Sequence, residues 1–224
     1  MNFPDGLFAA PWVFAGNVLF GVLLFWSAVR APWRELAQEP RLHRWLAAIV
    51  LLALCWNLKA GVRPGLNLHF LGVTTLYLMF GGRLALVALA LILVAVCLNH
   101  SAGFMDYGLN GLVMIAAPLA VSTIMAGIVR RMPQHNLFVF LFLGGFFAAA
   151  CSVLATGILS ASLLLLAGEY NRYLLATEYL PFYCLLAFGE AWLNGAALTL
   201  MAVYAPHWLA GFDARRYLAL NEKL

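Results

Sequence analysis

The stretch LNLHFLGVTTLYLMFGGRLALVALALILVAVCLN, residues 66–99, consists of two apolar runs that only Gly81-Gly82-Arg83 separates. A helix needs about 20 apolar residues to cross a hydrocarbon core of about 30 Å, and somewhat fewer when its flanking side chains reach the interface. The runs 66–81 and 84–99 are both short by this measure. Whether the first run crosses the membrane or turns back within it decides on which side every later loop lies.

The rest of the chain is similarly apolar. Of its 224 residues, 65% are hydrophobic and 10% are charged, whereas globular domains average roughly 45–50% apolar and about 25% charged residues. This composition predicts an integral membrane protein surrounded by membrane lipid. No Pro/Ser-rich linker or charge block divides the sequence, so we expect a single transmembrane domain over residues 1–224.

Seven apolar runs predict an all-α bundle of about seven transmembrane helices. They cover residues 11–29, 45–59, 66–81, 84–99, 109–129, 137–167 and 180–206. Cytoplasmic loops carry an excess of Lys and Arg. With seven spans and an outer N-terminus, three cations lie outside and ten lie inside, namely Arg30, Arg34, Arg41, Arg44, Arg83, Arg130, Arg131, Arg215, Arg216 and Lys223. If the run 66–81 does not cross, five lie inside and eight outside. The charges therefore favour an outer N-terminus and an inner C-terminus.

The net charge of +4 does not indicate nucleic-acid binding, because the basic residues lie in short loops where they determine topology. The four cysteines lie inside apolar runs without a CxxC pair, as small buried hydrophobic residues do. The chain contains neither the GxSxG and HExxH motifs of hydrolases nor the GxxxxGK[ST] motif of nucleotide-binding proteins. These observations argue against an intramembrane enzyme and against an ATPase within this chain.

The predicted topology brings three polar stretches to the outer face. A histidine inside an apolar run costs free energy unless it has a partner, and neutral imidazole is the commonest metal ligand in proteins. Metal binding is one interpretation of the outer histidines, and hydrogen bonding to loop carbonyls or water is the other. The stretches are MNFPDG at 1–6, GVRPGLNLHFLG at 61–72 with Asn67 and His69, and NHSAGFMDYGLNG at 99–111 with His100, Asp106 and Asn110.

Glu190 lies in the middle of the last apolar run, with Asn194 four residues later on the same helical face. An intramembrane carboxylate is expected to face the bundle interior or a cavity, where it is paired or protonated. Its role is either substrate passage and helix coupling, or a structural hydrogen bond to a neighbouring helix. The sequence leaves both open.

Together these features resemble the CbiM/NikM family, the membrane substrate-capture (permease) components of energy-coupling-factor transporters for cobalt and nickel. Members have seven helices with an outer N-terminus. They open with Met-His, two further residues, an acid and a glycine, and four short family motifs follow one another in order along this chain. The corresponding stretches are MNFPDG at 1–6, HFLG at 69–72, SAGFMDYGLNGLVM at 101–114 and GEAWLNGAALT at 189–199.

The resemblance implies that residues 1–10 fold into the outer mouth of the bundle. There the amine of Met1, the next backbone nitrogen and the side chain of the second residue bind the metal ion. His69, before the third helix, completes a planar set of nitrogens that suits Ni(II). The ion is the substrate and no organic cofactor is expected. Asn67, Asn110 and Glu190 are candidate supporting polar residues.

The chain departs from this pattern at its second residue, which is Asn2 rather than histidine. A carboxamide is a poor ligand for a transition metal, so the planar four-nitrogen site cannot form. Met1 and His69 remain, and a mixed nitrogen and oxygen site suits Zn(II), Co(II) or Mn(II) better than square-planar Ni(II). The residues that are expected to supply replacement ligands are His100, Asp106 and Asp5.

We therefore expect a multi-pass protein of the bacterial inner membrane that captures a divalent transition-metal ion for uptake. A coupling transmembrane protein and separate ATPase subunits are expected as partners. The main alternative is a family-derived membrane receptor or regulatory protein that no longer transports metal. A haem protein with His69 and His100 as axial ligands is a further alternative.

Overall fold

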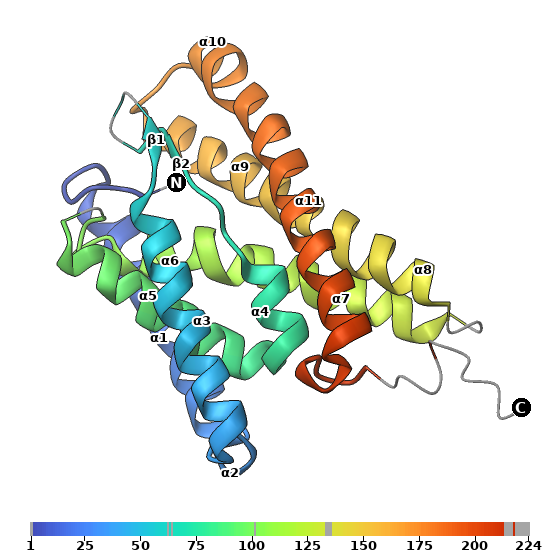
Figure 1. Cartoon of the computed structure of the whole chain (residues 1–224). Helices are drawn as coiled ribbons and strands as arrows, with labels where there is room; N and C mark the ends of the chain where they lie inside the picture. Colours follow the sequence, from blue (N-terminus) through green and yellow to red (C-terminus); the bar gives the residue numbers. More distant parts are fainter. Residues whose placement is uncertain are drawn as a thin grey trace, which may run out of the picture.

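The structure, a computed structural model, describes residues 2–61, 63, 65–100, 102–132, 136–212 and 217. It is a helical bundle, with a two-stranded hairpin at the end where the N-terminal segment lies (Figure 1). We call this the outer end and the opposite end the inner end, following the predicted topology. The elements are α1 (Ala10–Arg30), α2 (Trp33–Leu36), α3 (Glu39–Asn57), β1 (Ala60–Gly61), β2 (Asn67–Leu68), α4 (Val73–Phe80) and α5 (Gly82–Leu98).

Three further helices are continuous and contain π-helical segments. The first comprises α6 (Tyr107–Gly111), η1 (Leu112–Ala116) and α7 (Ala117–Arg131). The second comprises α8 (Leu137–Val139), η2 (Phe140–Phe147) and α9 (Ala148–Leu166). The third comprises α10 (Arg172–Leu174), η3 (Leu175–Tyr179) and α11 (Leu180–Tyr204), and a short 3-10 turn, η4 (Pro206–Trp208), follows it.

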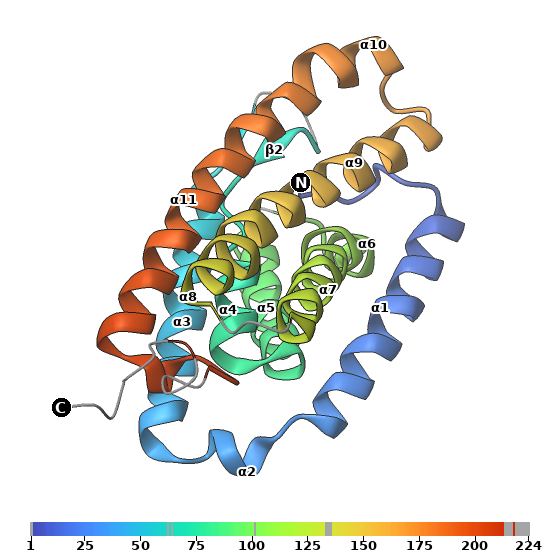
Figure 2. The ribbon, with the colours of Figure 1, turned by 90° about the vertical axis from the view of Figure 1, so that its right-hand side faces the viewer.

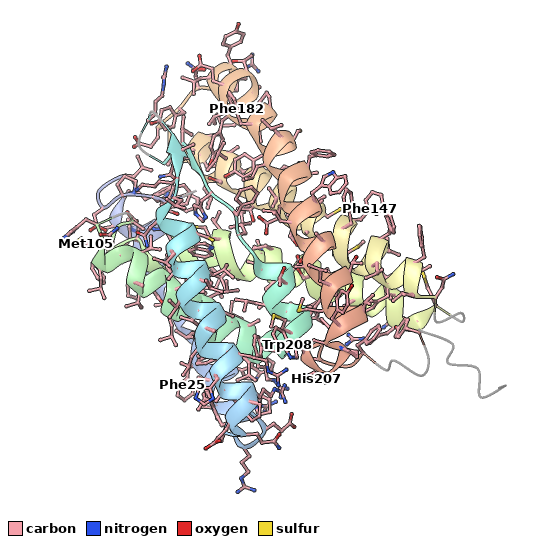
Figure 3. All side chains as sticks on the ribbon, in the orientation of Figure 1. Phe25, Met105, Phe147, Phe182, His207 and Trp208 are labelled. Atoms are coloured by element: carbon pink, nitrogen blue, oxygen red, sulfur yellow. The ribbon has the colours of Figure 1, made fainter. Side chains whose placement is uncertain are left out.

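Four helices of the described residues are long and apolar enough to cross a membrane, and Gly82–Leu98 is apolar but shorter. The four cover Ala10–Arg30, Tyr107–Arg131, Leu137–Leu166 and Arg172–Tyr204. Side chains such as Phe25, Phe147 and Phe182 point away from the bundle, as lipid-facing side chains do (Figure 3). These findings confirm the all-α membrane fold that the sequence predicts.

The segment between α3 and α5 crosses the bundle although little of it is helical. Asn99 Nδ2 donates to Asn57 Oδ1 at 2.7 Å, which places the last residues of α3 and α5 at the same, outer end. Arg83 Nη1 donates to the carbonyl of Arg30 at 2.9 Å, which places the first turn of α5 at the inner end of α1. Residues 58–81 must therefore return from the outer to the inner end, which makes seven crossings within the described residues.

The predicted third helix, 66–81, is helical only over Val73–Phe80. Eight residues span about 12 Å of helix, so the remaining distance is covered by the hairpin, in which Ala60 pairs with Leu68, and by the extended residues 69–72. Gly72 precedes α4 with a φ of +64°, and a Cβ there would lie 2.5 Å from Leu52 Cδ2. The glycine of the HFLG motif is therefore required by both its backbone angle and its close packing.

The short α4 and the apolar α5 lie at the centre of the bundle together with α7, and α1, α3, α9 and α11 surround them (Figure 2). Hydroxyl groups hold the central helices together. Thr74 Oγ1 lies 2.9 Å from Ser122 Oγ, which lies 3.1 Å from Ser152 Oγ, so α4, α7 and α9 meet at these three side chains. Small and hydroxylated residues allow close helix contacts inside a membrane. This core lies at α4, which directly follows the extended segment 69–72.

Candidate functional site

The first described residues enter the outer end of the bundle as an extended segment that two asparagine side chains hold. Asn67 Oδ1 accepts from the backbone N–H of Asn2 at 2.8 Å, and Asn67 Nδ2 donates to the Asn2 carbonyl at 3.4 Å. Asn110 pairs with Phe3 in the same way: its Oδ1 accepts from the Phe3 N–H at 2.7 Å, and its Nδ2 donates to the Phe3 carbonyl at 3.0 Å. A carboxamide offers a donor and an acceptor side by side, so each asparagine pairs with its backbone as a neighbouring strand would.

Side-chain packing and a carboxylate fix the same segment. The rings of Phe3 and Phe8 are buried and meet edge to face, with centroids 4.9 Å apart. Gly103 N–H donates to the Phe3 carbonyl at 2.9 Å, and Asp5 Oδ1 accepts from the N–H of Met105 at 2.7 Å. A Cβ on Gly103 would lie 2.2 Å from Asp5 Oδ1, so this contact requires glycine.

His69 lies on the loop between β2 and α4 and is 3% exposed. Its Nε2 is 3.0 Å from Asn2 Oδ1, and its Nδ1 is 3.1 Å from the carbonyl oxygen of Phe70. Burial disfavours the charged form of this imidazole, because the charged ring loses its water and both of its nitrogens face neutral oxygens. His69 is therefore neutral at physiological pH.

A neutral imidazole carries one N–H and cannot donate to two oxygens. With the proton on Nε2, His69 donates to Asn2 Oδ1, and 3.0 Å is an ordinary distance for this hydrogen bond. With the proton on Nδ1, His69 donates to the Phe70 carbonyl, and its Nε2 lone pair faces Asn2 Oδ1, as it would with an ion between the two atoms. Metal-ligating histidines commonly donate their second nitrogen in this way to a carbonyl or carboxylate. Two ligands at about 2.1 Å from one ion lie about 3.0–3.4 Å apart when they subtend 90–109°, and the 3.0 Å between Nε2 and Oδ1 agrees with this separation.

A cavity of about 540 Å³ opens at the outer end in front of Asn2. The described residues that line it include Asn2, Asn67, His100 and Asp5, whereas His69 lies behind Asn2. Lys59 and Arg63 also form part of its wall. An ion that arrives from outside thus meets the carboxamide of Asn2 before the imidazole of His69.

The remaining predicted ligands occupy different positions. His100 is exposed on the cavity wall with a φ of +50°, and Asp5 holds the 103–106 turn through backbone N–H groups. Asp106 is fully buried, and neither of its oxygens has a hydrogen-bond partner within the part of the chain that the structure describes. Burial, and secondly the negative charge of Asp5, raise the pKa of Asp106 to about 6. Met1 lies outside the described residues.

Of the predicted ligands, the structure brings Asn2 and His69 into contact. Within the part of the chain that the structure describes, no three His, Cys, Asp or Glu side chains cluster closely enough to hold a metal ion. A site on Asn2 and His69 would therefore rely on amide and backbone donors in addition to imidazole.

Trp56, which was not singled out from the sequence, supports the loop of residues 69–72. Its Nε1 donates to the carbonyl of Leu71 at 3.0 Å, and its ring lies 5.0 Å from that of His69. The signal available in the sequence was a tryptophan inside an apolar run, because a buried indole N–H requires an acceptor. Glu190, singled out in the sequence, binds the same loop: it accepts from the N–H of Leu71 at 2.9 Å and of Gly72 at 2.5 Å.

Comparisons with known proteins give the family and the fold of the chain. A family model described as "Cobalt uptake substrate-specific transmembrane region", CbiM, matches residues 2–208. No curated protein matches the chain. Two crystal structures, one of a truncated transition metal transporter and one of a transition metal transporter, each match 90% of this chain with a TM-score of 0.72 and 16% sequence identity. The matches cover 98% and 92% of those chains respectively, and at this identity they show a shared fold.

Proposed function

Because the chain belongs to the CbiM family of cobalt-uptake transmembrane regions, we propose that it captures a divalent transition-metal ion at its outer end through His69 and Asn2. The chain is a multi-pass membrane component of metal uptake and not an enzyme. The observation that carries the proposed site is the 3.0 Å separation between His69 Nε2 and Asn2 Oδ1, which fits two neighbouring ligands of one ion.

The proposed donor set combines nitrogen and oxygen. His69 provides a neutral imidazole nitrogen, and the carboxamide of Asn2 provides a weakly basic oxygen. We propose the amine of Met1 as a further nitrogen, as the family resemblance implies. Such a set favours Co(II) or Zn(II) over Ni(II), which gains most from four nitrogens in a plane. Since the amine has an ordinary pKa near 8, binding releases a proton at neutral pH.

The proposal includes partners and a location. The chain has no nucleotide-binding motif, so active uptake requires separate ATPase subunits and a coupling membrane protein. The excess of cations at the inner end supports an orientation in the bacterial inner membrane with the metal site on the outside.

The test is the metal content of the full chain purified in mild detergent and measured by elemental mass spectrometry. Wild type is expected to hold about one equivalent of Co or Zn after incubation with an equimolar mixture of Mn, Co, Ni and Zn. His69→Ala is expected to lose it. His207→Ala, which changes an exposed histidine at the inner end (Figure 3), is the matched control and is expected to keep it.

Asn2→His tests the selectivity separately. A second imidazole beside His69 restores the nitrogen-rich set, so the Ni(II) content is expected to rise at the expense of Co(II) and Zn(II). Equal metal content in wild type and His69→Ala would contradict the proposed site. Metal binding that depends on His69 without uptake in cells would favour the receptor alternative.

A further inference from the structure

Glu190 is a buried carboxylate in the middle of α11, 5% exposed. Its Oε2 accepts from the backbone N–H of Leu71 at 2.9 Å and its Oε1 from the N–H of Gly72 at 2.5 Å. Because both oxygens accept from N–H donors, neither needs a proton. A buried carboxylate is tolerated inside a membrane protein when it is satisfied in this way. Both oxygens are occupied, so the carboxylate is a fixed part of the structure and not a vacant cation site.

The Leu71 N–H belongs to the same peptide group as the Phe70 carbonyl. That carbonyl faces Nδ1 of His69 at 3.1 Å. Glu190 and His69 therefore hold the two ends of a single peptide group, with the carboxylate on its N–H and the imidazole on its C=O. Hydrogen bonds in such a chain polarise one another, so the negative charge of Glu190 strengthens the acceptor that His69 uses.

We infer that Glu190 is a positioning residue for metal capture, which acts on His69 through the Phe70–Leu71 peptide group. It keeps the proton of His69 on Nδ1 and the Nε2 lone pair toward Asn2. The arrangement resembles the carboxylate–histidine–metal chains in which an outer carboxylate orients a ligand and raises its basicity, with a peptide group inserted between carboxylate and imidazole. The inference rests on the proposed function, because it requires His69 to bind the ion.

Neighbouring contacts fix the residues on both sides of this peptide group. Trp56 Nε1 donates at 3.0 Å to the Leu71 carbonyl, which belongs to the next peptide group. Gly189, the residue before Glu190, allows the Phe70 ring to lie close, since a Cβ there would be 3.2 Å from Phe70 Cε1. The dipole of α4, which begins directly after Gly72, further favours a negative charge at this position.

A second contact joins α11 to α4 one turn further along. Thr75 Oγ1 donates to Asn194 Oδ1, and Asn194 Nδ2 donates to the Gly145 carbonyl at 2.9 Å. These bonds hold α4 against α11 independently of Glu190. A conservative change at Glu190 is therefore expected to leave the bundle folded, and Asn194→Ala provides a matched control that weakens the same helix pair without touching residues 69–72.

The experiment measures Co(II) affinity of the full chain in detergent for wild type, Glu190→Gln, Asn194→Ala, His69→Ala and the double variant Glu190→Gln/His69→Ala. Glutamine keeps one acceptor oxygen and turns an NH2 group toward the other N–H. Outer-shell changes typically cost 10–100-fold in metal affinity, and we expect a loss of this size in Glu190→Gln with a shifted Co(II) visible spectrum. We expect less than about a twofold effect of Glu190→Gln in the His69→Ala background.

Four results would overturn the inference. An unchanged affinity in Glu190→Gln would do so while leaving the proposed function intact. An equal loss in Asn194→Ala, or an equal effect of Glu190→Gln with and without His69, would assign Glu190 to general packing. Absence of any metal binding in wild type would remove the proposed function and the inference with it.

A measurement on the wild type keeps the inference testable if Glu190→Gln does not fold. Nitrogen-15 NMR of histidine-labelled protein loaded with Zn(II) shows which imidazole nitrogen binds the ion. The inference predicts the ion on Nε2 and the proton on Nδ1 of His69, and an ion on Nδ1 would contradict it.

Discussion

His69 is buried, and each of its ring nitrogens faces an oxygen of a neighbouring residue. In the proposed site the Phe70 carbonyl accepts a hydrogen bond from Nδ1–H, so Nε2 needs no deprotonation before it binds an ion. Any proton released on binding must then come from another ligand. In the proposed site, the imidazole thus binds without losing a proton, and the amine of Met1 is the ligand that loses one.

Asp106 is expected to make the protein less stable as the pH rises. Its pKa is raised to about 6, so its contribution to stability is present below its ordinary pKa of 3.8 and is lost as the pH rises through 6. At pH 8 the buried carboxylate is charged, and its oxygens have no hydrogen-bond partner among the described residues. Asp106→Asn removes this charge at nearly constant size, and we expect it to stabilise the protein by about 1–3 kcal/mol at pH 8 and much less at pH 4. A lower melting temperature of Asp106→Asn at pH 8 would refute this.

At the scale of elements, the N-terminal segment depends on two asparagines that lie on different parts of the chain. Asn67 comes from β2 and Asn110 from α6, and each pairs with the backbone of one residue of the segment. The segment has no strand of its own to pair with. Its position, and with it the position of Asn2, is therefore set by side chains of elements that the sequence separates by more than 40 residues.

Loss of either asparagine is expected to loosen the segment. Asn110→Ala leaves the N–H of Phe3 without its partner, while the Phe3 carbonyl still accepts from Gly103 N–H. An unsatisfied buried group costs about 1–3 kcal/mol. We expect faster hydrogen exchange in residues 2–8 and a weaker metal affinity. Asn136→Ala, which removes a helix cap at α8, is the control and is expected to change neither. Unchanged exchange in Asn110→Ala would show that the two phenylalanine rings suffice to hold the segment.

The sequence predicted the elements better than it predicted their ends. The apolar runs correspond to the seven crossings, and outside residues 58–81 these are continuous helices, which satisfy their own backbone groups. The run 66–81 was predicted as a candidate span, and it is helical only over Val73–Phe80. Hydropathy reports only that Leu66–Gly72 is apolar, whereas Glu190 and Trp56, which are distant in sequence, bind its backbone and make an extended conformation possible.

The candidate site was partly visible in the sequence. His69 and Asn2 stand at family positions, and polar residues inside apolar runs mark places where partners must exist. The pairing of Asn67 and Asn110 with the segment, and the link from Glu190 through a peptide group to His69, depend on three-dimensional contacts. No spacing along the chain encodes them.

At the scale of the whole molecule, the topology depends on the crossing by residues 58–81. The account predicts that a membrane-impermeant maleimide added to intact cells labels Met105→Cys, at the outer end, and not His207→Cys, at the inner end (Figure 3). Both variants are made in a chain whose native cysteines are replaced by alanine. If the segment did not cross, both positions would lie on the opposite side of the membrane. Labelling of His207→Cys and not of Met105→Cys would therefore contradict the crossing by residues 58–81.

The arrangement also explains how one end of the molecule is specialised. The outer end gathers the N-terminal segment, the hairpin and the loop before α6 around a polar cavity of about 540 Å³. The inner end carries cations against tryptophan rings, with Arg30 and Arg83 both over Trp26 at 5.4 and 5.5 Å. The polar cavity and the cation–tryptophan contacts thus lie at opposite ends of the helices.

The most direct test of the central claim is the X-ray absorption spectrum of the Co(II)-loaded protein at the cobalt edge. The account predicts a first shell of mixed nitrogen and oxygen ligands with the scattering signature of a single imidazole, and loss of that signature in His69→Ala. A spectrum without imidazole scattering in wild type, or one that is unchanged in His69→Ala, would contradict metal capture by His69.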